Sequence, residues 1–573
     1  MNQKIKIGNG GVITLTDKFY FASGGEASIY VTNGMAYKLY HEPTKKQLPL
    51  QKMKELATIN NDQVIIPQEL IYDAKNGNPL GYTTKFIVDA EPILKYFTKT
   101  FKNDNNISFL MIIDLIKKMQ EITLDIHNSK CLVVDYNELN ILIKAENGGL
   151  IPYYIDCDSY QTPSFKSSAV MKSIMDRRVA NTTNHGHLDY HPDEMSDWFS
   201  WGILSFNALI NIHPFRVSHP NYRPNQKEKQ MDDNVSVFDP QSKMPPSVNP
   251  LTIIPKRLLD WYKFIFSDIK NRSIPPLPDS SVPLVVPTQL VTITGTDKIT
   301  VEEVNSYDSH IIDVFSIMGI TYVATKTHIY NKNKEIGTHN AKKILLCAAL
   351  DGTLITAQQE NSSKILFKNK TDAIGTATSS MMFSRNNAIY TLGHGKLIEN
   401  SFVSFGSKIV HRTTEVENVS TTSATVYPGC VVQDLLRRWY ITIPYKLGSC
   451  FSKPLMELFG YRIIDAKSEK TVTVIIAEKS GKYDRFILVF TKDYSDFNIR
   501  KVEDISYDKI NFTVLDNGLC MLLSTQDELE LFYDNKNIEI IKSPPFDCTM
   551  PLFSSSDGVF FINGNSIHKI QKS

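Results

Sequence analysis

The texture of the sequence changes at a Pro/Ser-rich stretch, SIPPLPDSSVPLVVP, which covers residues 273–287. Before this stretch, strand-like and helix-like segments alternate. After it, nearly every segment is a short strand pattern bounded by turn residues. A chain of 573 residues is also too long for a single core. We therefore predict a linker at 276–290 that separates a mixed α+β part from an all-β part at 291–573.

The part after the linker contains strand cores that recur along the chain, several of them followed by a turn and a second strand. Examples are ITYVAT at 320–325, GTLITAQ at 352–358 and GVFFING at 558–564. Successive cores are roughly 32 to 49 residues apart, a spacing that is typical of propeller blades. The pattern predicts a β-propeller of about seven blades, although no WD dipeptide marks the repeat. A pair of β-sandwiches is the alternative.

The part before the linker begins with strands and continues with helices. Glycine and Asn-Gly turns separate the strand patterns of the first 90 residues, and one helix pattern lies at about 45–57. An amphipathic helix pattern follows in ISFLMIIDLIKKMQEITLDIHN. The segment DWFSWGILSFNALI is apolar nearly all round, which predicts a buried helix with Ser196 or Asp197 at its N-cap. We expect a five-stranded β-rich lobe with one helix at 1–90 and a helical lobe at 91–275.

Charge and composition argue against several classes of protein. Lys and Arg number 62 and Asp and Glu number 61, so a net charge of +1 provides no basic field for nucleic acid. No apolar run approaches the roughly 20 residues of a membrane-spanning helix, and MNQKIKIGNGG lacks the apolar core of a secretion signal. The seven cysteines are scattered and form no CxxC pair, which fits a reducing compartment. We expect a cytoplasmic protein without a membrane partner.

A turn of small residues near the N-terminus suits phosphate binding. It lies between two strand patterns and consists of Gly24, Gly25, Glu26 and Ala27. Small residues let backbone N–H groups approach a phosphate closely. A plain hairpin explains the same pattern, so the turn alone does not identify a nucleotide site.

Lys38 lies in the next strand pattern, MAYKLY, between apolar neighbours. Such a lysine either faces solvent or reaches inward to phosphate oxygens. In the second case a carboxylate on the following helix would hold it. Glu55 is the candidate for that carboxylate, and Glu42 is the alternative.

The stretch LVVDYNELNILI at 132–143 places a charged, amide-rich loop between two apolar runs. The polar groups of such a loop need partners, so the loop is costly unless it has a function. Asp135 can orient an attacking hydroxyl or accept its proton, and Asn140 can bind a metal ion through its carbonyl oxygen. Asp156 ends the strand pattern YYIDCD, where a carboxylate suits Mg²⁺ that bridges nucleotide phosphates. Asp158 is either an additional metal ligand or a turn cap.

In order and spacing these residues resemble the motifs of the protein kinase family, over about residues 15–275. Asp135 and Asn140 form the pattern D-x-x-x-x-N, and Asp156 follows Asn140 by 16 residues. The D-x-x-x-x-N pattern and Asp156 both come after Lys38, a lysine in a strand pattern that follows a glycine turn. The closer resemblance is to an atypical bacterial and phage subgroup, carried by GGEASIY, VDYNELNIL and IDCDSYQ. The resemblance implies a bilobal kinase fold that uses ATP and Mg²⁺.

The resemblance also implies a role for each matching residue. Lys38 would contact the α and β phosphates, and Glu55, with Glu42 as the alternative, is the candidate for its partner. Asp135 would be the catalytic base. Asn140 and Asp156 would hold the metal ions, with Asp158 as a possible further ligand.

The segment DYHPDEMSDWFSWGILSFNALINIHPFR is similar to the substrate-lobe segment of kinases. Pro192 and Glu194 match the end of the activation segment. Asp197 matches the aspartate that braces the backbone of the catalytic loop. Arg272 matches the late arginine of the family, which implies an ion pair between Arg272 and Glu194.

The sequence departs from the family pattern at several positions. Ala22 and Ala27 occupy the first and third glycine positions of the loop, which implies weaker nucleotide binding or turnover. Val133 and Val134 replace the His-Arg pair before the base, which argues against control by phosphorylation of the activation segment. Cys157 replaces the phenylalanine of the metal motif, which argues against a mobile motif.

Three hypotheses about function follow. The first is an ATP- and Mg²⁺-dependent kinase that acts on protein Ser or Thr, with a C-terminal propeller that recruits a substrate or partner. No sequence feature fixes the acceptor, so tyrosine, a small molecule and transfer of the AMP moiety of the nucleotide are alternatives. The second is a catalytically weak or inactive scaffold, or a virion component if a phage encodes the protein. The third is a nucleic-acid protein, suggested by the basic and aromatic stretch LLRRWY at 435–440. The near-zero net charge argues against the third hypothesis.

Overall fold

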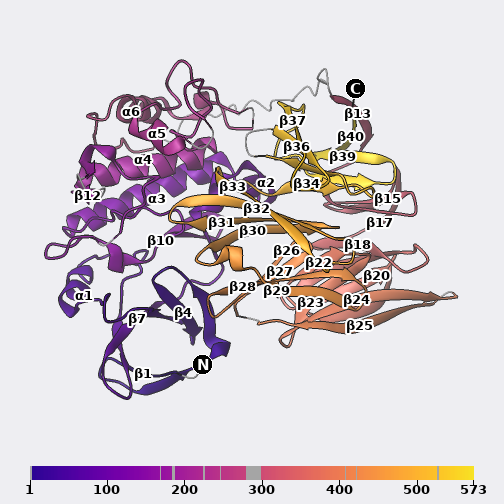
Figure 1. Cartoon of the computed structure of the whole chain (residues 1–573), viewed down its shortest axis with the longest axis horizontal. Helices are drawn as coiled ribbons and strands as arrows, with labels where there is room; N and C mark the ends of the chain where they lie inside the picture. The colour runs from indigo at the N-terminus through magenta and orange to yellow at the C-terminus, as the bar shows by residue number, and fades with distance from the viewer. Residues whose placement is uncertain are drawn as a thin grey trace. The chain divides into compact units, whose positions relative to one another are not determined.

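The computed structural model divides the chain into two compact units (Figure 1). The first unit comprises Met1–Gln289, Lys479–Tyr483 and Asp504–Asp508, and the second comprises Leu290–Glu478, Asp484–Glu503 and Lys509–Ser573. Most of the predicted linker at 276–290 lies outside the described residues. The structure describes residues 3–167, 169–182, 188–223, 226–245, 247–278, 299–406, 408–420, 422–524 and 528–572. The described chain is mostly β, with few helices and many small antiparallel sheets.

The first unit begins with a seven-stranded sheet. Its strands are β1 (Gln3–Ile7), β2 (Val12–Leu15), β3 (Tyr20–Ser23), β4 (Ala27–Thr32), β5 (Met35–Tyr40), β6 (Glu69–Asp73) and β7 (Pro79–Lys85). They lie in the order β2-β1-β6-β7-β5-β4-β3, and every neighbouring pair is antiparallel. The prediction of five strands was wrong, because β1 pairs with β6 and thereby joins the β1–β2 hairpin to the sheet.

Helices make up much of the remainder of the first unit. They are α1 (Leu50–Leu56), α2 (Lys99–Asp104), α3 (Phe109–Asn128), α4 (Glu194–Ile210), α5 (Lys227–Asp232) and α6 (Lys256–Ser267). The amphipathic pattern correctly predicted α3, whose buried face includes Ile112, Leu115 and Ile116. None of the helices in the described ranges is long and apolar enough to cross a membrane.

The N-cap of α4 is Asp193, so the prediction of Ser196 or Asp197 was wrong. The Asp193 carboxylate accepts a hydrogen bond from the backbone N–H of Ser196 at 2.8 Å, and the Ser196 hydroxyl accepts one from the backbone N–H of Asp193 at 3.0 Å. This reciprocal capping box begins the helix one turn earlier than expected. The carboxylate of Asp197, in the first turn of α4, is therefore not used to cap the helix and can bind groups outside it.

A small antiparallel sheet carries the loops that hold the polar motifs. It contains β8 (Ala90–Pro92), β9 (Ile141–Glu146) and β10 (Gly149–Tyr154), and a further two-stranded sheet pairs β11 (Ala180–Thr182) with β12 (Leu188–Tyr190). In the β9–β10 hairpin Ile141 faces Tyr154. The residues just beyond this pair, Asn140 and Ile155, therefore lie opposite one another, and the N–H of Ile155 donates to the carbonyl oxygen of Asn140 at 2.9 Å.

Seven four-stranded antiparallel sheets follow, and the described residues between 299 and 572 contain no α-helix. In six sheets the four strands are consecutive in sequence, whereas the seventh has the order β13-β40-β39-β38 and so pairs the first strand with the last. The strands are β13 (Ile299–Ser306), β14 (Ile311–Ile317), β15 (Ile320–Thr325), β16 (His328–Asn331), β17 (Lys334–Thr338), β18 (Ile344–Ala348), β19 (Leu354–Asn361), β20 (Lys364–Asn369), β21 (Asp372–Thr378), β22 (Met382–Arg385), β23 (Ala388–Gly393), β24 (Lys396–Phe405), β25 (Lys408–Asn418), β26 (Ala424–Tyr427), β27 (Cys430–Leu435), β28 (Arg438–Lys446), β29 (Ser449–Pro454), β30 (Arg462–Glu469), β31 (Val472–Lys479), β32 (Lys482–Phe490), β33 (Phe497–Ile505), β34 (Asn511–Val514), β35 (Cys520–Leu523), β36 (Glu528–Phe532), β37 (Ile538–Lys542), β38 (Leu552–Ser555), β39 (Gly558–Asn563) and β40 (Ser566–Lys572).

Side chains connect the neighbouring sheets of this series. Asp313 of β14 accepts a hydrogen bond from the backbone N–H of Leu346 in β18 at 2.7 Å. Buried apolar residues fill the spaces between sheets, as where Phe367 of β20 contacts Phe402 of β24. A cluster of the same kind contains buried residues of both the β14–β17 sheet and the β13–β40 sheet.

Candidate active site

Lys38 lies on β5 and faces the interior, with only 8% of the residue exposed. Its Nζ atom is 2.6 Å from Oδ1 of Asp156 and 2.9 Å from Oδ1 of Asp158. Burial alone would lower the pKa of Lys38, but the two carboxylates outweigh it and raise the pKa above its usual value. The sequence left two orientations for Lys38, toward solvent or toward the interior, and in the structure the side chain points toward the interior.

Asp158 is buried and accepts hydrogen bonds through both carboxylate oxygens. Tyr82 and Lys38 donate to Oδ1 at 2.6 and 2.9 Å, and Tyr40 donates to Oδ2 at 2.8 Å. Burial would raise the pKa of this carboxyl group, but the charge of Lys38 and these hydrogen bonds lower it. The partners of Asp158 in the structure are therefore hydrogen-bond donors of the protein. From the sequence we expected Asp158 to be a metal ligand or to cap a turn.

The helix carboxylate that we expected beside Lys38 lies elsewhere. Glu55 accepts hydrogen bonds from the Gln51 side chain and from the backbone N–H of Ser164, both at 3.1 Å. Hydrogen bonds received by the Glu55 carboxylate lower its pKa to about 2. The pairing of Lys38 with Glu55 is wrong because Asp156 and Asp158 already hold the lysine.

Glu42, the alternative partner, forms an exposed ion pair with Lys45 at 2.8 Å. A different residue of α1 points toward the site. Lys52 is buried, and its Nζ atom donates to the backbone oxygen of Asp158 at 2.7 Å. Burial lowers the pKa of Lys52. The short helix thus contributes a cation, where we expected a carboxylate.

Asp135 and Asn140 are adjacent in the loop between α3 and β9. The amide nitrogen of Asn140 lies 3.4 Å from Oδ2 of Asp135. Because that nitrogen faces Asp135, the amide oxygen is left as the possible metal ligand. The hydrogen bond from Ile155 to the carbonyl oxygen of Asn140 places this pair beside Asp156. Lys38, Asp135, Asn140 and Asp156 are therefore linked through the end of one hairpin.

Asp156 has a backbone φ of +64°, in the left-handed region that non-glycine residues seldom adopt. Its side chain remains 43% exposed, unlike that of Asp158. A carboxylate oxygen and an amide oxygen are the hard ligands that Mg²⁺ prefers, so Asp156 and Asn140 fit this ion by their chemistry. Among the described residues no three His, Cys, Asp or Glu side chains gather as a metal site. These two residues would thus be the protein ligands, with the other positions left to phosphate and water.

The backbone of the loop before Asp135 is held from α4, as the resemblance implied. The carboxylate of Asp197 accepts hydrogen bonds from the backbone N–H groups of Val133 and Val134 at 2.8 and 2.9 Å. The ring of His127, at the end of α3, lies 3.0 Å from the same carboxylate. The predicted role of Asp197 is confirmed. Sequence reasoning did not identify His127 as its partner.

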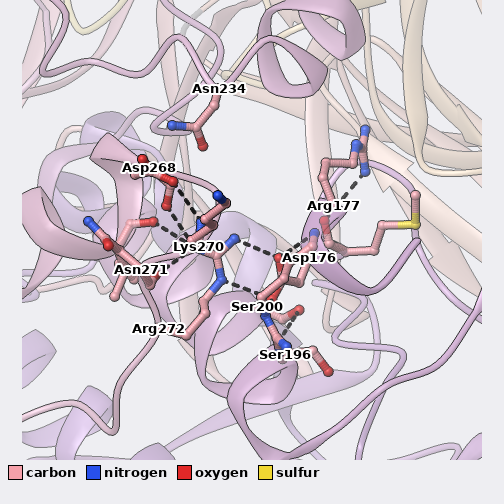
Figure 2. Close-up of polar contacts among 12 residues, drawn as sticks. Asp176, Arg177, Ser196, Ser200, Asn234, Asp268, Lys270, Asn271 and Arg272 are labelled. Carbon is pink, nitrogen blue, oxygen red and sulfur yellow. Dashed lines mark hydrogen bonds and ion pairs between the residues drawn. The ribbon is translucent and has the colours of Figure 1, made fainter. Parts of the chain in front are cut away.

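The ion pair predicted between Arg272 and Glu194 is wrong. Arg272 donates to both carboxylate oxygens of Asp176, at 2.6 and 2.8 Å, as Figure 2 shows. Asp176 is completely buried and therefore needs a charged partner, whereas Glu194 is exposed at the start of α4. Arg178 also approaches Asp176, at 3.3 Å, and it pairs with Asp193 at 2.6 Å. This chain of contacts ties the segment before α4 to the N-cap of that helix.

The turn between β3 and β4 is a tight hairpin loop. The N–H of Gly24 donates to the carbonyl oxygen of Ala27 at 2.9 Å, and the Glu26 carboxylate pairs with Lys46. A Cβ atom added at Gly24 or Gly25 would meet no atom within 4 Å, and neither glycine has a positive φ. The fold itself therefore does not require glycine at these two positions.

A comparison with protein-family models found no match, and a comparison with curated proteins found none. Among solved structures, the chain is similar to the kinase PK-1 of the Cydia pomonella granulovirus, with 13% sequence identity and a TM-score of 0.32. The similarity covers 44% of this chain and 88% of that chain. A likeness of this size carries no argument about activity, which has to come from the residues themselves.

Proposed function

We propose that the first unit is an ATP- and Mg²⁺-dependent phosphotransferase of the kinase type, with a protein Ser or Thr hydroxyl as acceptor. One observation carries the proposal. The β9–β10 register places the Asp135–Asn140 pair beside Asp156, and Asp156 contacts Lys38. This brings together a cation, two oxygen ligands and a carboxylate, the set that phosphoryl transfer needs for positioning and charge neutralisation.

Each of these residues has a role in the proposed reaction. Lys38 binds the α and β phosphate oxygens of the nucleotide as a fixed positive charge. Asp135 orients the acceptor hydroxyl and accepts its proton as the acceptor oxygen bonds to the γ-phosphorus and the bond from that phosphorus to ADP breaks, releasing ADP. Asn140 and Asp156 hold Mg²⁺, which when bound neutralises phosphate charge. Asp197 keeps Asp135 in place by binding the backbone N–H groups of the two residues before it.

We also propose that the seven sheets after residue 298 are the blades of a propeller that recruits the protein substrate or another partner. Pairing of β13 with β40 supports this arrangement, because it fastens the start of the series to its end. The clusters between neighbouring sheets support it as well.

The proposal is tested by transfer of labelled phosphate from ATP. Purified full-length protein is incubated with ATP labelled at the γ-phosphate and Mg²⁺, and label in protein and in free phosphate is measured. The wild type should consume ATP, and Asp135→Ala and Asp156→Ala should fall to background. Equal label with all three proteins would refute the assignment of these residues. Comparing phosphoproteins in cells that make the wild type or Asp135→Ala would then identify the acceptor.

A scaffold without catalytic turnover is the second candidate. Two observations favour it: Lys38 is bound by two carboxylates at once, and Ala22 and Ala27 stand where the family has glycines. A scaffold of this kind would give no labelled product with any acceptor. Nucleotide-dependent stabilisation would then be small or absent.

A further inference from the structure

We propose that Asp158 is the positioning residue for Lys38, and that it replaces the helix carboxylate of kinase-like sites, so that the lysine is held without any contribution from Glu55 of α1. This inference rests on the proposed function for its consequences in catalysis. The contacts that support it lie entirely within the first unit.

Three donors reach Asp158 from two neighbouring strands of one sheet. Lys38 and Tyr40 are two residues apart on β5, so their side chains leave the same face of the strand. Tyr82 of β7 lies directly opposite Lys38 in the register of the sheet. All three side chains converge on one carboxylate, at 2.6 to 2.9 Å. The sheet that carries the lysine thus also fixes the orientation of its anion.

The backbone around Asp158 is held as well. Lys52 binds the carbonyl oxygen of Asp158 at 2.7 Å, and the Ser159 hydroxyl donates to the carbonyl oxygen of Asp156 at 2.9 Å. The thiol of Cys157, a buried residue, lies 3.5 Å from the carbonyl oxygen of Ile65. Asp156 and Asp158 are therefore presented to Lys38 by a short segment with contacts at each of its residues.

This arrangement has a consequence for regulation. A lysine that depends on a carboxylate of a separate helix is released when the helix moves away. Here the carboxylate is bound by β5 and β7, whose backbones are joined by ladder hydrogen bonds. Movement of α1 would change the contact of Lys52 but would leave the contacts of Tyr40 and Tyr82 with Asp158. The site is accordingly assembled at all times, without an on–off step at this helix.

The test measures the state of the Lys38 amine directly, and it does not depend on turnover. Full-length protein is acylated with an amine-reactive reagent at pH 8, and modification of Lys38 is quantified by mass spectrometry. In Asp158→Asn the amine loses one of the two carboxylates that hold it, so Lys38 is less restrained and its acylation at pH 8 should rise severalfold. Tyr82→Phe removes only a hydroxyl, so it should give a smaller rise. If Asp158→Asn fails to fold, the result with Tyr82→Phe still tests the inference.

Two further variants separate Asp158 from other carboxylates. Glu55→Gln should change acylation and the KM for ATP far less than Asp158→Asn, which should raise that KM about tenfold. Asp114→Asn, which removes an exposed carboxylate paired with Lys118 on α3, is the matched control and should change neither. A larger effect of Glu55→Gln than of Asp158→Asn, or no change of acylation in either Asp158→Asn or Tyr82→Phe, would overturn the inference. If the wild type neither binds nor consumes ATP, the proposed function fails, but the acylation result still decides how Lys38 is held.

Discussion

The carboxylate of Asp197 accepts the backbone N–H of Val134 at 2.9 Å, and Val134 has a φ of +62°. A β-branched residue is strained in this conformation, at a cost on the order of 1–3 kcal/mol. The strain persists because a buried anion binds this N–H and the preceding one. Since Val134 immediately precedes Asp135, the same contact sets the position of the proposed base.

We therefore expect Asp197→Asn to impair turnover more than nucleotide binding. An amide cannot accept both N–H groups as the carboxylate does, so the loop before Asp135 should relax. A displacement of the Asp135 carboxylate by about 1 Å reduces kcat about a hundredfold. The KM for ATP should change little, because the substitution leaves Lys38 in place. Initial rates over a range of ATP concentrations measure the two parameters. A rise in KM with unchanged kcat would contradict this role for Asp197.

A second prediction concerns the turn at Gly24 and Gly25. Because the fold has room for a Cβ atom at both positions, Gly24→Ala and Gly25→Ala should leave the free energy of unfolding unchanged or raise it by about 0.4–1 kcal/mol. If the turn covers nucleotide phosphates, the added methyl groups should nevertheless raise the KM for ATP. Denaturation and initial rates on the same preparations measure both. Unchanged KM values would assign the turn to hairpin formation alone.

The buried pair of Asp176 and Arg272 gives a prediction about stability. Asp176→Asn leaves Arg272 buried without its anion, so the free energy of unfolding should fall by about 3–5 kcal/mol. Glu194→Gln is the matched control at the residue that the family resemblance had paired with Arg272. It is exposed, and its effect should stay within about 0.5 kcal/mol. Equal destabilisation by the two substitutions would contradict the observed pairing.

Lys102 makes the stability of the first unit depend on pH. Its ammonium group is buried against Asn211 and the carbonyl oxygen of Ala208, and burial lowers its pKa to about 7. Between that value and the ordinary pKa of 10.5, the unfolded state binds the proton more often than the folded state. Stability contributed by this group therefore rises with pH across this window, by at most about 1.4 kcal/mol per pH unit.

Comparison with Lys102→Met isolates this effect from other titrating groups. The free energy of unfolding of the wild type relative to the variant should increase from pH 7 to pH 9. Denaturation followed by tryptophan fluorescence is suitable, because Trp198, Trp201 and Trp261 lie in the first unit. Parallel pH profiles for the two proteins would show that Lys102 does not titrate in this range.

Local patterns in the sequence predicted the parts of the site that depend on local structure. Helix α3 followed from the apolar spacing between residues 109 and 128. The family resemblance implied that Asp135 and Asn140 would lie near Asp156, and the register of β9 with β10 brings these parts of the backbone together. That proximity follows from one hairpin, because β9 and β10 are joined by a short turn. Asp197 was identified because the family resemblance extends to the start of α4.

Contacts between distant segments could not be predicted in the same way. Asp158 contacts Tyr40 and Tyr82 only because β5 and β7 are neighbours in one sheet. The alternation of residues within each strand does not determine which strands pair. The alternation of residues in β5 does indicate one of these contacts, because Lys38 and Tyr40 lie on the same face of the strand and can reach the same partner. Arg272 was assigned to Glu194 by analogy, and no pattern near Asp176 indicated that it would be buried.

We propose that Lys38, Asp135, Asn140 and Asp156 surround one nucleotide with its metal ion, and nucleotide-dependent stabilisation tests this arrangement most directly. Thermal unfolding of the full-length wild type, Lys38→Met and Asp156→Ala is measured with and without ATP, in the presence and absence of Mg²⁺. A ligand at 100 times its Kd stabilises a protein by about 2.7 kcal/mol. We predict a rise in the unfolding temperature of the wild type that requires both ATP and Mg²⁺ and is lost in both variants. No rise at millimolar ATP, or the same rise in all three proteins, would contradict the claim.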